Sequence, residues 1–408
     1  MNSSFPSDEP LRLLVVISRY LPAFSGAALQ QHDVLRQLAA RVRATVVTLG
    51  APGLTERESL DGVEVLRLGD SAAGRTGRVR FLFGVLLHLL RHARDYDAVH
   101  VFSAGWAAFL VPLLARCIGL STLYSSTLQG SDDAASVAAQ SLGRWKMRLL
   151  RLHRRVACYT PEQSRGFVEA GFSEESTVTI TCGVDDSFYA PSSEEDCRRS
   201  LRRDAGQQAE GPLVLFIGTL TARKGVDLLV EAFRRLLARS PSAVLVLMGP
   251  KSREEDSTLD EQFLRQLAKR CGEGELRGHV LMTGRIDSGE RKRAVIRAAD
   301  AFALFSQAEG LGIVILEAMS CAVPPVLTPI PGVFDYVVDD GRTGRIATSR
   351  DADELAGLLV ETLEPRRNRE LGAAARREIE RRFSMRAIAR RYLEQYRWLA
   401  RFRRSTAP

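Results

Sequence analysis

Two glutamates eight residues apart are the side chains in this sequence best placed for chemistry. Glu309 and Glu317 flank Gly310 and Gly312 in the tract AEGLGIVILEAM, residues 308–319. An apolar strand pattern precedes the tract, and a helical pattern follows it. We therefore expect these glutamates at a turn that leads from a strand into a helix.

Such a turn places backbone N–H groups at the N-terminus of a helix. The N–H groups near Leu311 and Ile313 would lie there, where the helix dipole favours a phosphate. Glu317, further along at about 1.5 Å per residue, would then reach a ribose diol, while Glu309 would face a sugar. The alternative is a pair of surface glutamates flanking an amphipathic helix.

A basic pair occurs at a second predicted strand-to-helix turn. The tract GTLTARKG, residues 218–225, begins at Gly218 and carries Arg223 and Lys224. Two such cations can neutralise a diphosphate leaving group. An isolated Arg-Lys pair is also a common solvated feature of protein surfaces.

Several longer tracts carry a family resemblance. They are FIGTLTARKGVDLL at 216–229, EGLGIVILEAM at 309–319, PGVFDYVVDDGRTG at 331–344 and CGVDDSFYAP at 182–191. Together they resemble the retaining glycosyltransferases of family 4, which have the GT-B fold. The likeness covers nearly the whole chain and is specific in its C-terminal half.

The resemblance implies a nucleotide-diphosphate sugar as donor, held in a cleft between two domains. It assigns Lys224 to the diphosphate, Glu317 to the ribose, and Glu309 with the amides after it to the sugar. Gly26, in an N-terminal loop, would let its backbone approach the phosphate or sugar, because glycine has no Cβ. The family moves a hexose with retention and without a bound metal or other cofactor. Its acceptors are glycans or lipid-linked molecules of cell-envelope or polysaccharide synthesis.

Three departures from the family pattern concern the candidate site and its surroundings. Thr219 stands where the family often has arginine, which makes Arg223 the candidate second phosphate ligand. Gln129 stands in a loop where many members carry a histidine, and glutamine cannot accept a proton. Asp335 replaces the more usual glutamate, which is a conservative change.

Other chemistries have weaker support in the sequence. Two Asp-x-Asp tracts, at 95–97 and 351–353, match a metal-binding motif of the other large glycosyltransferase fold. One opens a predicted strand and the other a predicted helix, where charged residues are common, so we expect no metal site. Neither a G-x-G-x-x-G nor a G-K-[ST] motif occurs, which argues against dehydrogenases and P-loop enzymes.

Alternating strand and helix patterns predict the elements that position these residues. Short apolar runs such as 13–17, 98–102, 213–217 and 301–305 alternate with helical patterns, which is typical of parallel sheets covered on both faces. The fold class is therefore α/β, with two doubly wound Rossmann-like domains facing a cleft. We expect an acceptor-side domain over 1–190, a linker over 191–212 and a nucleotide-sugar domain over 213–384. A final helix over 385–408, with a basic tail, would pack back on the first domain.

Composition describes a soluble globular protein with an uneven charge. The net charge is +8 and the pI about 9.4, and residues 366–408 hold fourteen Arg against four Glu. This surplus suits an anionic partner or simply solvated helix faces, and no nucleic-acid-reading module accompanies it. The six cysteines are far apart, which is typical of reduced thiols in a cytosolic protein.

A peripheral membrane contact at the cytoplasmic face is also expected. The apolar residues Phe81, Leu82, Val85, Leu86 and Leu89 lie among arginines within 77–94, and the segment 144–155 sets Trp145 among cations. Basic helices with an apolar face can lie on an anionic membrane surface. The alternative is that both apolar faces pack on the N-terminal sheet.

Three functions remain open at this point. The first is a retaining, metal-independent glycosyltransferase. The second is a nucleotide-sugar epimerase of the same fold, and the third is a non-catalytic protein that binds sugar nucleotides or glycans.

Overall fold

The computed structural model divides the chain into two compact units. Unit 1 is formed by Met1–Gly183 and Met385–Pro408, and unit 2 by Val184–Ser384. The residues described are 9–22, 26–102, 105–127, 130–256, 259–286 and 288–403.

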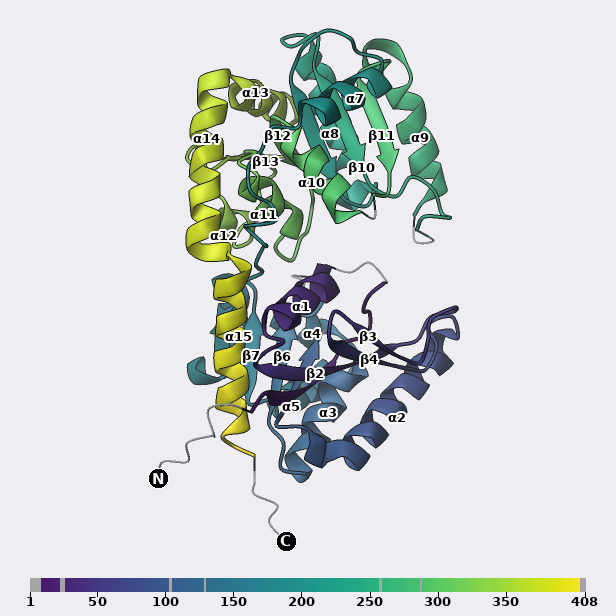
Figure 1. Cartoon of the computed structure of the whole chain (residues 1–408), viewed down its shortest axis with the longest axis vertical. Helices are drawn as coiled ribbons and strands as arrows, with labels where there is room; N and C mark the ends of the chain where they lie inside the picture. Colours follow the sequence, from purple (N-terminus) through teal and green to yellow (C-terminus); the bar gives the residue numbers. More distant parts are fainter. Residues whose placement is uncertain are drawn as a thin grey trace. The chain divides into compact units, whose positions relative to one another are not determined.

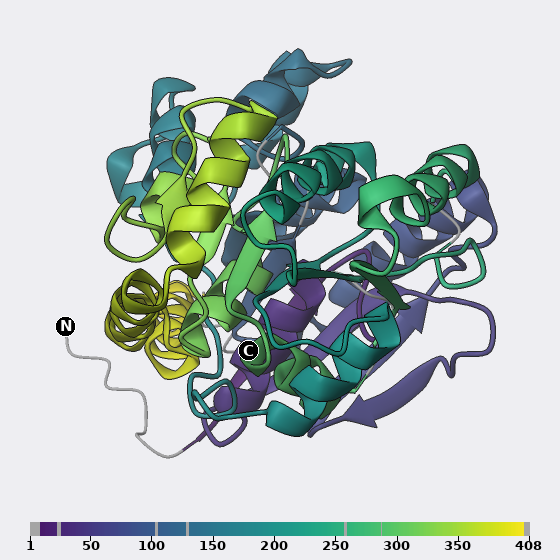
Figure 2. The same ribbon diagram turned by 90° about the horizontal axis from the view of Figure 1, so that it is seen from above.

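Unit 1 is built on a sheet that, within the described residues, has eight strands in the order β3-β4-β2-β1-β5-β6-β7-β8. All neighbours pair in parallel except β3 and β4, a hairpin at the edge of the sheet that Figure 2 shows in blue-purple. The strands are β1 (Leu11–Val16), β2 (Val42–Leu49), β3 (Arg57–Leu60), β4 (Val63–Leu68), β5 (Ala98–Phe102), β6 (Thr122–Ser126), β7 (Arg155–Cys158) and β8 (Thr177–Thr179).

Helices cover both faces of this sheet (Figure 1). On one face α1 (Gly26–Gln37) and α15 (Met385–Ala400) share a core with Leu13, Val15 and Val46. On the other face α2 (Gly74–His92), α3 (Trp106–Cys117) and α5 (Gly143–Leu150) share a core with Leu14 and Val16. Unit 1 also contains η1 (Ala93–Asp95), α4 (Ala134–Ala139), α6 (Pro161–Glu169) and η2 (Glu174–Ser176).

A polar network inside unit 1 ties α15 to the sheet. His100 of β5 is fully buried, and its Nδ1 lies 2.9 Å from the Tyr396 hydroxyl of α15. Its Nε2 lies 2.7 Å from Ser125 Oγ of β6, and Gln31 Nε2 of α1 donates to the same Tyr396 hydroxyl. Because a buried polar group is costly without a partner, this network fixes where α15 lies on the sheet.

Unit 2 has a fully parallel sheet of six strands among the described residues, in the order β11-β10-β9-β12-β13-β14. The strands are β9 (Leu213–Ile217), β10 (Val244–Met248), β11 (Val280–Gly284), β12 (Ala301–Leu304), β13 (Pro325–Leu327) and β14 (Arg345–Ile346). The helices are α7 (Glu195–Ala205), η3 (Ala222–Lys224), α8 (Val226–Leu237), α9 (Glu261–Cys271), η4 (Gly274–Leu276), α10 (Gly289–Arg297), α11 (Ile313–Ser320), α12 (Phe334–Val337), α13 (Ala352–Leu363), α14 (Pro365–Glu378) and η5 (Ile379–Phe383).

The segment 191–212, expected to be a linker, contains helix α7. Leu201 and Ala205 of this helix are buried, and so is Arg202. The Arg202 guanidinium donates to the carbonyl oxygens of Gly211 and Ser242, each 2.9 Å away. Paired in this way, a charged side chain can lie inside a domain, which is why the charged composition was misleading. The boundary between the units also falls earlier than expected, between Gly183 and Val184.

The apolar face expected to contact a membrane is part of the core of unit 1. Phe81, Val85 and Leu89 of α2 are buried, and so are Met147 and Leu150 of α5. These side chains pack toward the sheet, so they cannot form the expected membrane contact, whereas Trp145 of the second segment is exposed.

Candidate active site

The order of strands in unit 2 changes direction between β9 and β12. From β9 the chain adds β10 and β11 on one side, and then β12, β13 and β14 on the other. In open α/β sheets, ligands bind beyond the carboxyl ends of the strands at such a point. The loops that follow β9 and β12 carry Lys224 and Glu309, so the fold itself brings the two predicted sites together.

Lys224 and Glu309 form an ion pair across these loops. The Lys224 Nζ contacts Glu309 Oε1, and the two side chains are only 16% and 8% exposed. Ser306 Oγ donates to the same Glu309 oxygen at 2.7 Å. The pair is thus a largely desolvated charge pair with a defined geometry, which a surface Arg-Lys pair would not have.

Gly225 permits the close packing of the two loops. Its φ is +66°, and a Cβ at this position would lie 2.0 Å from the Phe305 carbonyl oxygen. Only glycine avoids both the strained dihedral and this clash. Lys224 is therefore held against the end of β12 by the residue that follows it.

The loop that carries Glu309 is held by hydrogen bonds to its first carbonyl oxygens. Thr328 Oγ1 donates to the Ser306 carbonyl oxygen at 2.8 Å. Arg350 Nη1 donates to the carbonyl oxygens of Phe305 and Ser306 at 2.8 and 2.7 Å. Sequence reasoning missed Ser306, Thr328 and Arg350, since each lies outside the recognised tracts.

Arg223 joins the same two loops through the backbone. Its Nη1 donates to the Ala308 carbonyl oxygen at 2.8 Å, and its own carbonyl accepts from the Gln307 N–H at 2.8 Å. The side chain is exposed. Arg223 therefore lies next to Lys224 and Glu309, as the sequence predicts, but it also has a structural role there.

The glycine-rich turn after Glu309 leads into α11. Gly310 and Leu311 are buried, Gly312 has a left-handed φ of +80°, and the helix begins at Ile313. The first N–H groups of a helix have no partner within it and carry the positive end of its dipole. An anion bound beside Glu309 would lie close to the first N–H groups of α11.

Glu317 is held by two residues that the sequence did not single out. Lys292 Nζ of α10 lies 2.7 Å from Glu317 Oε1 and 2.6 Å from Oε2, and the Tyr189 hydroxyl donates to Oε1 at 3.1 Å. The Glu317 side chain is 9% exposed. Lys292 lies in a run of three cations, 291–293. The sequence of this run does not indicate which of the three side chains pairs with Glu317.

Of the remaining predicted site residues, Gly218 lies beside Lys224, since a Cβ on Gly218 would be 4.0 Å from Lys224 Cδ. Gly218 lies at the end of β9, where its N–H donates to the Met248 carbonyl oxygen at 2.9 Å. Gly26 is exposed at the start of α1 in unit 1. Gln129 lies outside the described residues.

The two Asp-x-Asp tracts have structural partners. Asp97 pairs with Arg12 at 2.8 Å, and also with Arg403 of the C-terminal segment at 2.5 Å. Asp351 caps α13 by accepting from the N–H groups of the second and third residues after it. Among the described residues, no group of three or more His, Cys, Asp and Glu side chains is arranged to hold a metal ion.

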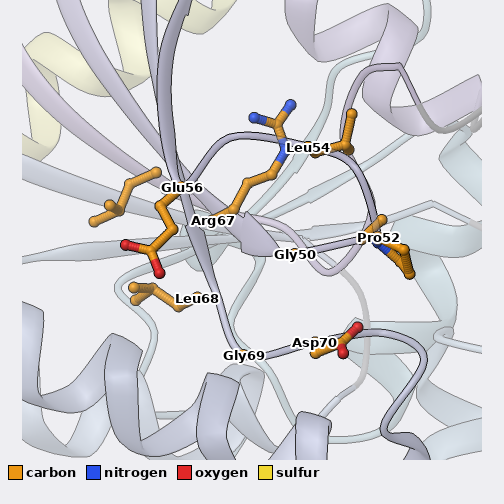
Figure 3. A pocket seen from close by; sticks show the side chains of 10 residues that line it. Gly50, Pro52, Leu54, Glu56, Arg67, Leu68, Gly69 and Asp70 are labelled. Atoms are coloured by element: carbon orange, nitrogen blue, oxygen red, sulfur yellow. The ribbon is translucent and has the colours of Figure 1, made fainter.

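A cavity of about 400 Å³ lies in unit 1, beside the ends of β2 and β4 (Figure 3). It is lined by the loop after β2, which contains Pro52 and Leu54, and by residues 66–70. The Arg67 guanidinium has partners within the protein, because it donates to the Leu21 carbonyl oxygen at 2.7 Å and forms an ion pair with Glu58. Arg67 is therefore not a free cation that could bind a phosphate in this cavity.

Comparison with known proteins identifies the family of this chain. Residues 198–378 match the family described as glycosyl transferases group 1, and residues 25–183 match the glycosyl transferase 4-like domain. Alpha-maltose-1-phosphate synthase of Mycolicibacterium smegmatis is 34% identical, over 95% of this chain and 99% of that protein. A GDP-mannose-dependent monoacylated alpha-(1-6)-phosphatidylinositol monomannoside mannosyltransferase of Corynebacterium glutamicum is 29% identical, over 73% of this chain and 75% of that protein.

Solved structures show the same fold. Sucrose-phosphate synthase of Thermosynechococcus elongatus superposes with a TM-score of 0.78 at 22% identity, over 95% of this chain and 99% of that one. Anabaena HepE in complex with UDP-glucose superposes with a TM-score of 0.75 at 20% identity, over 95% of this chain and 100% of that one. The two doubly wound units, the matched families and the M. smegmatis relative lead to one conclusion: the chain belongs to the group 1 glycosyltransferases of family 4 and has the GT-B fold.

Proposed function

We propose that this glycosyltransferase takes a hexose from a nucleoside diphosphate sugar and transfers it with retention, without a bound metal. The observation that carries the proposal is the largely desolvated Lys224–Glu309 pair at the switch point of the unit 2 sheet. The Corynebacterium relative is named for GDP-mannose, and HepE was solved with UDP-glucose. Both names support a nucleotide-sugar donor here.

The proposed roles follow from charge and position. Lys224 would stabilise the negative charge that develops on the departing diphosphate, because an ammonium in a desolvated site interacts strongly with a developing anion. The N-terminal N–H groups of α11 would add to this, and Arg223 lies close enough to contribute. These positive groups take the part that a divalent cation plays in metal-dependent transferases, which is why we propose metal independence.

The carboxylates would orient the donor. Glu309 would accept hydrogen bonds from sugar hydroxyls, and Glu317 from the ribose hydroxyls. The acceptor oxygen then bonds to the anomeric carbon on the face from which the diphosphate leaves. The bond from that carbon to the phosphate oxygen breaks, and the leaving phosphate oxygen takes the proton of the acceptor hydroxyl. The acceptor is proposed to be a glycan or a lipid-linked molecule.

A ligand panel tests the donor. Uridine, guanosine and adenosine diphosphates and their hexose derivatives are added to the protein, and the melting temperature is recorded. A ligand that binds only the folded state raises the melting temperature, so at least one diphosphate should do so. No response to any of them would contradict the donor assignment.

Product analysis tests the reaction. Nuclear magnetic resonance of the product should show the same anomeric configuration as the donor, and excess chelator should leave the rate unchanged. An epimerase would convert the donor without an acceptor, whereas a transferase releases nucleoside diphosphate in step with acceptor consumption. Inverted product, or activity that chelator abolishes and Mn²⁺ restores, would refute retention or metal independence.

A further inference from the structure

Helix α2 exposes an apolar stripe that is distinct from its buried face. Val79, Phe83, Leu87 and Leu90 are 52%, 67%, 45% and 54% exposed. At about 100° per residue these positions fall within roughly 80° of the helix circumference. Phe81, Val85 and Leu89 already fill the core on the opposite side, so this second stripe is not needed for folding.

The stripe continues onto two neighbouring helices. Helix α2 packs against α3, and α3 packs against α5 (Figure 1). Lys146 Nζ of α5 lies 5.6 Å from the ring centre of Trp106 on α3, which joins the surfaces of these helices. Nine large hydrophobic side chains are exposed in the part of the chain that the structure describes, and all but Phe402 lie on or next to these helices. We call this surface the α2–α3–α5 face; its exposed apolar residues are Val79, Phe83, Leu87, Leu90, Trp106, Leu113, Leu142 and Trp145.

The same three helices carry positive charge and no acidic side chain. They contain eight Arg and Lys residues and no Asp or Glu: Arg75, Arg78, Arg80, Arg91, Arg116, Arg144, Lys146 and Arg148. The rest of the chain contains 49 cationic and 49 acidic residues, so the net charge of +8 equals that of these helices. On α2, Arg78 and Arg80 precede and follow Val79 in the sequence, and both are exposed.

The arginine-rich segment after residue 366 differs in this respect. Arg376 pairs with Glu380, and Arg381 and Arg382 both pair with Glu378. Three of its arginines are therefore paired with glutamates, although residues 366–408 hold ten more Arg than Glu.

We infer that the α2–α3–α5 face docks on an anionic lipid surface. Large exposed apolar patches mark interaction sites, and a patch without carboxylates selects a negatively charged partner. Arginine stems can lie along the acyl boundary with their charges at the headgroups, and tryptophan favours the same depth. None of the helices in the described residues is both long and apolar enough to cross a membrane, so the contact is peripheral. The inference goes beyond the donor site and does not depend on it.

Vesicle sedimentation tests the inference on the full chain. Vesicles of phosphatidylcholine with phosphatidylglycerol should carry the protein into the pellet, and vesicles of phosphatidylcholine alone should bind it far more weakly. Binding should weaken as salt rises from about 0.05 M to about 0.5 M, because the Debye length falls severalfold. Protein that stays in the supernatant with anionic vesicles at low salt overturns the inference.

Two pairs of variants locate the contact. Phe83→Ser with Leu90→Ser should lower the partition coefficient by about tenfold or more, while Phe402→Ser, an exposed aromatic elsewhere on unit 1, should leave it unchanged. Arg78→Glu with Arg80→Glu should also lower it by about tenfold or more. Arg265→Glu with Lys269→Glu on α9 makes the same change in net charge and should lower it much less. All four substitutions on α2 are at exposed positions, so the melting temperature should stay near that of the wild type.

Tryptophan fluorescence gives a second readout. Trp106 and Trp145 lie on the α2–α3–α5 face, and the third tryptophan, Trp398, is on α15. Anionic vesicles should shift the emission to the blue, and Trp145→Phe should reduce the shift. Equal binding by the α2 variants and the wild type overturns the inference. So does a lipid-free dimer that Phe83→Ser converts to a monomer, since the face would then be a protein interface.

Discussion

Lys292 of α10 contacts both carboxylate oxygens of Glu317 on α11, at 2.7 and 2.6 Å. The two side chains are 16% and 9% exposed, so the ion pair is largely removed from water. Such a pair holds the carboxylate in one orientation, which is what recognition of a ribose diol requires. Lys292 is thus a positioning residue for the proposed nucleotide site.

Replacement of Lys292 by Met should weaken binding of the preferred nucleoside diphosphate by about tenfold, because Glu317 loses its orientation and keeps an uncompensated charge. Calorimetric titration measures the effect. Arg291→Met, at the exposed neighbouring position, is the matched control and should bind as the wild type does. Equal affinity in both variants would show that Lys292 only stabilises the fold.

Loss of Lys224 should act on the transition state. Lys224→Ala should lower kcat/KM by the equivalent of about 2–4 kcal/mol, as expected when one charge-stabilising group is lost. Arg223→Ala should also reduce the rate if it serves as a second phosphate ligand. Steady-state kinetics with the donor found in the ligand panel measure both, and a Lys224→Ala enzyme with wild-type kcat/KM refutes the proposed role.

The glutamate pair should separate binding from turnover. Glu317→Gln should weaken nucleotide binding even without a sugar, whereas Glu309→Gln should chiefly lower kcat because Glu309 is proposed to contact the reacting sugar. Titration with a bare diphosphate and kinetics with the full donor distinguish the two effects. Wild-type affinity and rate in both variants would remove the carboxylates from the site.

Gly225→Ala should destabilise unit 2. Its φ of +66° and the approach of Phe305 O to 2.0 Å from a Cβ predict a loss of about 2 kcal/mol or more in the free energy of unfolding. Gly357→Ala on α13 is the control, since a Cβ there meets nothing within 4 Å and should stabilise the helix slightly. Urea unfolding of the three proteins gives the comparison, and equal midpoints would contradict the proposed constraint.

Acid should destabilise unit 1 through buried histidine. Burial lowers the pKa of His153 to about 4, against about 6.5 in an unfolded chain. Between these values the unfolded chain binds a proton that the native protein does not, so the free energy of unfolding falls as the pH falls. His153 should account for about 3 kcal/mol of this loss, and His100, whose pKa burial also lowers, adds to it.

His153→Gln should therefore flatten the dependence of stability on pH between about pH 6.5 and about pH 4. Urea unfolding at several pH values measures the slope. His92→Gln, at an exposed position, should keep the wild-type slope. A His153 variant with an unchanged slope would contradict the assignment.

Strands of buried aliphatic residues could be predicted from the sequence. The run 98–102 coincides with β5 and the run 213–217 with β9, because every position in them is apolar or buried. β6 was missed because it contains Ser125 and Ser126, whose hydroxyls bond to His100 and Asp132 inside the core. A sequence does not show that a serine hydroxyl will have a hydrogen-bond partner in another element, so its burial cannot be predicted.

The site could be predicted only in part, because some of its residues come from distant parts of the sequence. Glu309, Glu317 and Lys224 stand in motifs that local pattern and resemblance could reveal. Lys292 and Tyr189 reach Glu317 from 25 and 128 residues away, so only the folded chain shows them. The exposed stripe of α2 differs from its core stripe by rotation about the helix, and hydropathy could not decide which of two apolar stripes faces the sheet.

The place of α15 in the chain has a consequence for biosynthesis. Unit 1 is completed by a helix that the ribosome makes only after the whole of unit 2. Until then the apolar surface that Ile388, Leu393 and Leu399 will cover stays open to water, and His100 lacks the Tyr396 hydroxyl. Unit 2 can therefore fold as soon as residue 384 has been made. Unit 1 remains incompletely folded until α15 has been synthesised. A nascent chain arrested just short of residue 385 should bind chaperones through its first half, although that half was translated first.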